Sequence, residues 1–136
     1  MKKKLRQMPV FFLVGSVLYP MIEILYRGYT HISMSILGGI CLCAIRGVDL
    51  ALGKGKLFLK ALCSAIIITQ LEFICGVIVN LGMGLSVWDY SQRPLNIAGQ
   101  ICPLFTFFWF LLSLPYFLLK KKVSKENFGL LKDNLG

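Results

Sequence analysis

The feature that most constrains this chain is a set of four long apolar runs, at residues 8–26, 32–52, 57–85 and 101–119. A helix needs about 20 residues, at about 1.5 Å each, to cross the hydrocarbon core of a membrane. The runs are continuous and do not alternate, which favours helices over a β-barrel. The sequence therefore predicts an all-α polytopic membrane protein, with four transmembrane helices as two hairpins in a single domain over residues 1–136.

The composition disfavours the soluble classes of protein. Of 136 residues, 57% are hydrophobic and 15% are charged, whereas about 25% of residues are charged in ordinary soluble domains. A chain this short cannot bury so much apolar surface in water, because small domains keep a large fraction of their surface exposed. The same excess of apolar residues argues against disorder. Neither a soluble enzyme nor a nucleic-acid binder is expected.

The placement of the basic residues predicts the orientation of the helices. The net charge is +9, and three basic groups flank the apolar runs: Lys2, Lys3, Lys4 and Arg6; Arg46, Lys54, Lys56 and Lys60; and Lys120, Lys121, Lys122 and Lys125. Basic residues beside a span stay in the cytoplasm, near anionic lipids. We therefore expect both termini and a polar tail at 120–136 in the cytoplasm, with a lipid bilayer rather than nucleic acid as the partner.

Two acidic residues, Glu23 and Glu72, lie within apolar runs. An ionised side chain at mid-bilayer costs at least about 2.5–3.5 kcal/mol, so both should face other helices or water. Arg27 follows Glu23 by four residues, which suits an ion pair on one helix face. Glu72 has no such neighbour. Either it pairs with Arg27, His31 or Arg93 from another segment, or burial keeps it protonated.

Small and polar residues recur in steps of three and four on three of the runs: Ser16, Pro20, Glu23 and Arg27; Ala65, Thr69, Glu72, Gly76 and Asn80; and Cys102, Thr106, Trp109 and Ser113. On the second run, Ser35 and Gly39 form a small-xxx-small pair. Such residues allow close helix packing in lipid. The stripes therefore indicate either packing alone or a polar cavity between helices that opens outward.

The two connections predicted to lie outside, at 27–31 and 86–100, are dense in polar and aromatic residues: Arg27, Tyr29, His31, Trp88, Asp89, Tyr90, Arg93 and Asn96. Trp88 and Tyr90 are either residues of the membrane interface or members of a ligand-binding or structural polar cluster with the other six. The polar residues either cap the fourth helix, with Asn96 as N-cap, or line a site. His31 either forms an interfacial hydrogen bond or exchanges protons.

The remaining residues give few signs of catalytic chemistry. The five cysteines lie in apolar runs and are expected as small buried residues, with a Cys75–Cys102 bridge left open. A single histidine gives poor support for a zinc site, and Walker, G-x-S-x-G and H-E-x-x-H motifs are absent. No cofactor or metal is expected. Arg46 and Asp49 are predicted to pair locally at the inner end of the second helix.

Two motifs combine charged and aromatic residues in a fixed order: YPMIEILYRGYTH at 19–31, with SM at 33–34 and GG at 38–39, and WDYS at 88–91, with PLN at 94–96 and GQIC at 99–102. They resemble a bacterial family labelled "putative ABC transporter permease, type IV". The resemblance implies a multi-pass protein of the bacterial cytoplasmic membrane. Four spans are fewer than in a typical permease, so a homo-oligomer or an unidentified membrane partner would supply further helices.

Transport of a small polar or ionic solute is the first functional hypothesis. Glu23 and Glu72 would share a wet outer crevice and bind a cation or exchange protons, and Arg27 would pair with Glu23 or contact an anionic group. Asp89, Arg93 and Asn96 would form the mouth of this crevice.

Two other hypotheses stay open. One is an accessory protein whose outer face docks a partner without transport. The other is a membrane enzyme acting on a lipid-linked substrate, with His31, Glu72 and Asp89 as acid and base; no nucleophile or metal set supports it.

Overall fold

The computed structural model describes the backbone of residues 6–135 and the side chains of residues 6–127 and 129. It contains α2 (Met8–Arg27), α3 (Ile32–Leu52), α4 (Leu57–Gly76), the π-helix η1 (Val77–Gly82), which continues α4, and α5 (Pro103–Leu135). No β-strand occurs within this part of the chain. Four helical segments are long and apolar enough to cross a membrane, so the prediction of an all-α polytopic membrane protein is confirmed.

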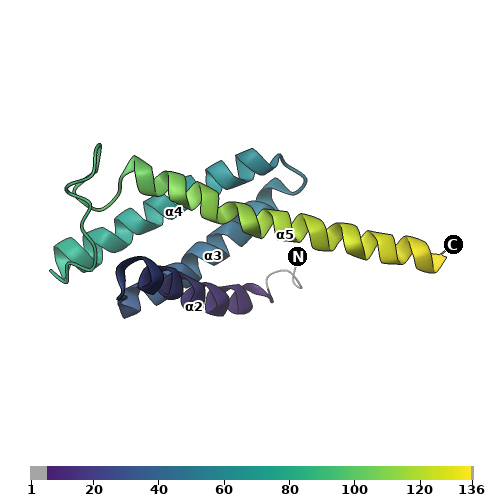
Figure 1. The fold of residues 1–136 in the computed structure, drawn as a ribbon, viewed down its shortest axis with the longest axis horizontal. Helices are drawn as coiled ribbons and strands as arrows, with labels where there is room; N and C mark the ends of the chain where they lie inside the picture. Colours follow the sequence, from purple (N-terminus) through teal and green to yellow (C-terminus); the bar gives the residue numbers. More distant parts are fainter. Residues whose placement is uncertain (1–5, 136) are drawn as a thin grey trace.

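The helices form two antiparallel hairpins, α2–α3 and α4–α5, packed against each other (Figure 1). The turn at 28–31 and the loop at 83–102 lie at one end, here called the loop end, where Arg27 Nη1 donates to Val87 O at 2.7 Å. The start of α2 and the α3–α4 turn lie at the opposite end, here called the terminal end. From there α5 projects past the other helices (Figure 1).

Local sequence explains where the first two helices end and begin. Gly28 adopts the left-handed conformation, with φ of 80°, and its N–H donates to Ile24 O at 2.8 Å, closing α2. A glycine has no Cβ and takes this conformation without strain. His31 caps α3 by accepting a hydrogen bond from Ser33 N at 3.2 Å. At its other end, α3 closes where Gly53 N donates to Asp49 O at 3.0 Å.

Three helix boundaries differ from the prediction by two residues or more. The α4–η1 helix ends at Gly82, three residues before the expected boundary at residue 85, while α5 begins at Pro103 and continues to Leu135 instead of ending near residue 119. Residues 120–135 are rich in lysine and leucine, which favour helix. A fall in hydropathy marks where a helix leaves the membrane, not where it stops, and the predicted polar tail is helical.

Glycines set the close packing of α2 on α3. A Cβ atom on Gly38 would overlap Tyr19 Cβ and the backbone of Gly15, and one on Gly39 would overlap Ser16 Oγ and the Phe12 ring. Small residues at these positions let the two backbones approach closely. The predicted packing role of Gly39 is therefore confirmed, with Ser16 as one of the side chains that it contacts.

A buried carboxylate connects three helices at the terminal end. Asp49 is 1% exposed and accepts hydrogen bonds from Lys60 Nζ at 2.9 Å, Arg46 Nη1 at 3.2 Å and Lys120 Nζ. The predicted Arg46–Asp49 pair is confirmed, and α4 and α5 each add a lysine to it. Lys2, Lys3 and Lys4, which also support the predicted orientation, lie outside the described residues.

Candidate ligand cavity

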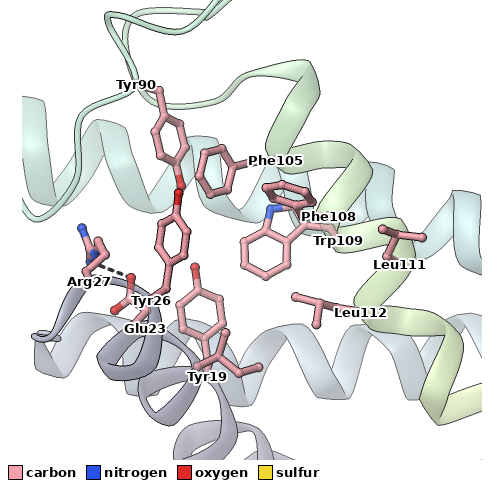
Figure 2. Close-up of a pocket in the computed structure, with 11 residues that line it drawn as sticks. Tyr19, Glu23, Tyr26, Arg27, Tyr90, Phe105, Phe108, Trp109, Leu111 and Leu112 are labelled. Atoms are coloured by element: carbon pink, nitrogen blue, oxygen red, sulfur yellow. Dashed lines mark hydrogen bonds and ion pairs between the residues drawn. The ribbon is translucent and has the colours of Figure 1, made fainter.

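A cavity of about 370 Å³ lies between α2 and α5 near the loop end (Figure 2). Its wall comes from α2, the 83–102 loop and α5: Tyr19, Ile22, Glu23, Tyr26, Arg27, Tyr90, Phe105, Phe108, Trp109, Leu111 and Leu112. Ile22, Tyr26 and Phe108 are also exposed on the outside of the bundle. The cavity is therefore open at the side of the bundle, where four apolar helices would meet lipid.

Aromatic rings make up most of the wall. Tyr19 stacks on Trp109 with ring centroids 5.3 Å apart, and Tyr90 stacks on Phe105 at 4.3 Å. Tyr26 meets Phe105 edge-on at 6.4 Å. Paired rings hold one another in fixed orientations. The wall therefore presents a preformed aromatic surface, and it differs from the mainly polar pocket that the sequence predicts.

An ion pair closes one end of the cavity (Figure 2). Arg27 Nη2 lies 2.6 Å from Glu23 Oε1, which confirms the predicted pair. Thr30 Oγ1 donates to the other oxygen of Glu23 at 2.7 Å. The guanidinium of Arg27 also donates to Val87 O and lies 4.7 Å from the centroid of the Tyr29 ring. Both charges are therefore compensated and held by neighbouring groups.

Glu72 lies behind the aromatic wall and is 1% exposed. Tyr90 Oη donates to Glu72 Oε1 and Trp109 Nε1 donates to Glu72 Oε2, each at 2.9 Å. Burial, followed by the charge of Glu72, raises the pKa of the Tyr90 phenol above its usual range. Tyr90 therefore stays protonated and remains a hydrogen-bond donor.

The partners predicted for Glu72 are wrong. Instead of Arg27, His31 or Arg93, the carboxyl group has two neutral donors, and no basic side chain in the described part of the chain lies within ion-pair distance of it. The partners come from the 83–102 loop and from α5. The buried acid is hydrogen-bonded, and no opposite charge lies beside it among the described residues.

The π-helix positions the loop that carries Tyr90. Asn80 Nδ2 donates to Trp88 O at 3.1 Å and to Gln100 Oε1 at 2.8 Å, while its Oδ1 accepts from Val87 N at 2.7 Å. Trp88 Nε1 donates to Gln100 O at 3.0 Å, and its side chain is buried. Trp88 is thus part of the protein core, and its interpretation as an interface residue is wrong.

The other predicted site residues shape the connections rather than the cavity wall. Asp89 is exposed and accepts from Ser91 N at 2.8 Å, and this backbone hydrogen bond holds the pKa of Asp89 below its usual range. Asn96 donates to Ser91 O and Arg93 O and accepts from Gly99 N. It lies in the loop, so its prediction as N-cap of the fourth helix is wrong.

The residues predicted to form the mouth of the cavity also lie outside its wall. Asp89, Arg93 and Asn96 do not line the cavity, and neither Tyr29 nor His31 does. His31 caps α3 through its ring nitrogen. Of the two acids expected to share a wet crevice, Glu23 lines the cavity, whereas Glu72 contacts it through the side chains of Tyr90 and Trp109.

Sequence reasoning missed most of the aromatic wall. Tyr19, Glu23 and Tyr26 lie four and three residues apart, which places them on one helix face. That spacing is the signal that could have identified the α2 side of the cavity. Phe105 and Phe108 carry no comparable signal, because phenylalanine is common throughout the fourth apolar run.

Residues 10–136 match the family described as "Putative ABC-transporter type IV". The chain belongs to this family. The resemblance of its two motifs is thereby confirmed, and no curated protein or solved structure is significantly similar to the chain. Family membership, together with four apolar helices of spanning length, makes this member of the ABC-transporter type IV family a transporter-like multi-pass membrane protein.

Among the described residues, the free cysteines and the candidate acid–base residues do not form a second candidate functional site. Cys75 and Cys102 are free thiols, so the bridge left open by the sequence is not formed. Among the described residues, no hydrogen bond joins His31, Glu72 and Asp89 to one another. The aromatic cavity is therefore the feature of this family member to which a ligand-binding function is best assigned.

Proposed function

We propose that this protein is the membrane component of a transport system and binds its small-molecule ligand in the cavity between α2 and α5. The observation that carries the proposal is a cavity of about 370 Å³ with an aromatic wall and an ion pair at one end. Ligand sites typically enclose about 300–1,000 Å³, with apolar walls and a few convergent polar groups. The cavity meets that description.

The shape of the cavity favours an elongated ligand with one polar end. Along α2, the wall runs from Tyr19 to Arg27, which is about 12 Å at 1.5 Å per residue. Glu23 and Arg27 lie at one end, and Leu111 and Leu112 lie at the other (Figure 2). A molecule with an apolar or aromatic body and a polar group would match both ends.

The charge distribution supports an orientation with the cavity in the outer half of the bacterial cytoplasmic membrane. The terminal end carries Lys54, Lys56 and the basic start of the α5 extension. Because cytoplasmic flanks are enriched in lysine and arginine, we place that end inside. The loop end, with the cavity beside it, then faces outward.

The transport system includes further chains in this proposal. The described part of the chain has four helices of spanning length, which are few for a permease, and no ATPase motif occurs in the sequence. A second copy, or another membrane protein, would complete the pathway, and a separate ATPase would drive it. The accessory-protein hypothesis differs in one respect, because it requires no ligand in the cavity.

Ligand binding is tested by isothermal titration calorimetry on purified protein in phosphatidylglycerol nanodiscs. The probes are benzyltrimethylammonium, benzyl alcohol and benzoate, which share an aromatic body and differ in charge. We expect at least one probe to bind, and Leu111→Trp, which fills the cavity, to abolish that binding. Leu118→Trp is the matched control, because Leu118 is a half-exposed leucine of α5 that does not line the cavity.

The same titrations can overturn the proposal. If none of the three probes binds, or if Leu111→Trp binds as well as Leu118→Trp does, the cavity is not a ligand site. The accessory-protein hypothesis would then be favoured.

A further inference from the structure

We propose that the ligand of this cavity is an organic cation, whose quaternary or protonated amine lies against the rings of Tyr19, Tyr90 and Trp109. This inference rests on the proposed function, since it names the chemical class that the cavity would take. Three features of the cavity favour a cation: the ring faces, the carboxyl group behind them and the compensated charges of the nearby ion pair.

The ring faces supply the first step. Tyrosine and tryptophan attract cations through the negative face of the ring, when the cation lies within about 6 Å of the ring centroid. Six aromatic side chains line the cavity: Tyr19, Tyr26, Tyr90, Phe105, Phe108 and Trp109. Several rings around one volume are the arrangement that recognises quaternary ammonium groups.

The carboxyl group of Glu72 supplies the second step. It accepts hydrogen bonds from Tyr90 Oη and Trp109 Nε1, the polar atoms of two side chains that line the cavity. A carboxylate that accepts these bonds increases the electron density of both rings, which strengthens their attraction for a cation. A buried carboxylate is also costly without an opposite charge. A cation in the cavity would provide that charge from the other side of the rings.

The Glu23–Arg27 pair supplies the third step. Arg27 also lines the cavity and could attract an anion, but its charge is compensated by Glu23 at 2.6 Å. Its guanidinium is also held by Val87 O and by the Tyr29 ring. The pair adds no net charge to the wall. Glu72, when ionised, is therefore the nearest charge without a partner, and it favours a cation.

The contribution of Glu72 can be estimated from the geometry. A cation about 5 Å from a ring centroid lies about 8 Å from a carboxylate bonded to the edge of that ring. At an effective dielectric constant of about 20, a unit charge at that distance changes an association constant roughly 30-fold. A hydrated cavity has a higher effective dielectric constant, about 30, which reduces this effect to about tenfold, so we expect a change of at least that size.

The test compares the three probes and then removes the charge of Glu72. In phosphatidylglycerol nanodiscs, benzyltrimethylammonium should bind more tightly than benzyl alcohol, and benzoate should bind least. Glu72→Gln should weaken binding of the cation at least about tenfold and leave benzyl alcohol unchanged. The glutamine can keep both hydrogen bonds, because its carbonyl accepts from Trp109 and its amide donates to Tyr90.

Two further variants keep the test decisive. Asp89→Asn removes the same charge from an exposed position outside the cavity and should leave binding of the cation unchanged. If Glu72→Gln does not fold, Tyr19→Leu replaces it, because it removes one ring that no hydrogen bond joins to Glu72. It should weaken binding of the cation about fivefold, the equivalent of about 1 kcal/mol for one cation–π contact.

A cationic group can come from a soluble molecule or from a lipid headgroup, and titrations in dodecylmaltoside micelles with and without phosphatidylcholine separate these sources, because neither medium carries a net charge. Weaker binding of benzyltrimethylammonium in the presence of phosphatidylcholine would mean that the choline headgroup competes for the cavity. Equal binding would assign the cavity to a soluble cation. Both results support recognition of an organic cation.

The inference and the proposed function fail differently. If benzyl alcohol or benzoate binds as tightly as the cation, or if Glu72→Gln binds the cation as the parent protein does, the inference is overturned while the cavity remains a ligand site. If no probe binds, both are overturned.

Discussion

Replacing Asp49 with asparagine should be among the most destabilising single changes outside the cavity. Asp49 is 1% exposed and is the only carboxylate that the described residues place against Arg46, Lys60 and Lys120. The substitution keeps the size of the side chain and removes its charge. Three basic side chains then repel one another around a neutral group.

The expected loss of stability depends on how exposed each of the three basic side chains is to water. The side chains of Arg46 and Lys60 are 9% and 11% exposed, whereas that of Lys120 is 47% exposed. Removing one partner of a buried ion pair costs about 3–5 kcal/mol, because an uncompensated charge stays buried. We expect Asp49→Asn to lower the free energy of unfolding by that amount. An exposed pair contributes about 0.2–1 kcal/mol, so Lys120→Met should cost no more than that.

The assay is a titration with sodium dodecyl sulfate in dodecylmaltoside micelles, with helix content followed by circular dichroism. Asp89→Asn serves as the control, because it removes the same charge from an exposed loop. A change below about 1 kcal/mol for Asp49→Asn, or an equal cost for Lys120→Met, would refute the reasoning from burial.

Two further predictions concern helix packing and the loop, and both use the same denaturation assay. Gly38→Ala should cost about 1–3 kcal/mol, because the new methyl group overlaps Tyr19 and the α2 backbone. Gly47→Ala, on the same helix with open space at its Cβ, should be neutral or stabilise by up to about 1 kcal/mol; equal effects would contradict the packing argument. Asn80→Ala should cost about 1–3 kcal/mol by leaving the buried Val87 N–H unpaired. It should also speed hydrogen exchange in the 83–102 loop, and unchanged exchange would show that Asn80 does not anchor it.

Features fixed by helix geometry could be predicted from the sequence. The bounds of α3, at Ile32–Leu52, agree with the second apolar run. The Glu23–Arg27 and Arg46–Asp49 pairs were also predictable, since residues three or four apart on a helix are neighbours. In each case the helix itself supplies both partners, and no knowledge of the tertiary arrangement is needed.

The partners of Glu72 could not be predicted in the same way. Tyr90 lies 18 residues from Glu72 and Trp109 lies 37 residues away, on a loop and on a separate helix. Their approach depends on the path of the 83–102 loop, which the Asn80 hydrogen bonds determine. The sequence shows that a buried acid needs a partner. It does not show that the partners of Glu72 are neutral hydrogen-bond donors, or that no basic residue lies close enough to pair with it.

The cavity itself depends on how the two hairpins meet. Tyr19 and Tyr26 on α2 face Phe105 and Trp109 on α5, and the volume between them is set by the packing of α3 on α4, which joins the two hairpins, together with that of α2 on α3 and of α4 on α5. Hydropathy identifies these residues as part of the spans. It cannot distinguish a ring that lines a cavity from one that faces lipid, because both environments are apolar.

The central claim, that a cation occupies the aromatic cavity beside Glu72, is tested most directly by nuclear magnetic resonance on protein in phosphatidylglycerol nanodiscs. The measurement is the set of nuclear Overhauser effects from the methyl protons of bound benzyltrimethylammonium to the aromatic protons of the protein. We predict effects to the rings of Trp109, Tyr90 and Tyr19. Effects only to rings outside the cavity, such as the exposed Phe58, would contradict the account.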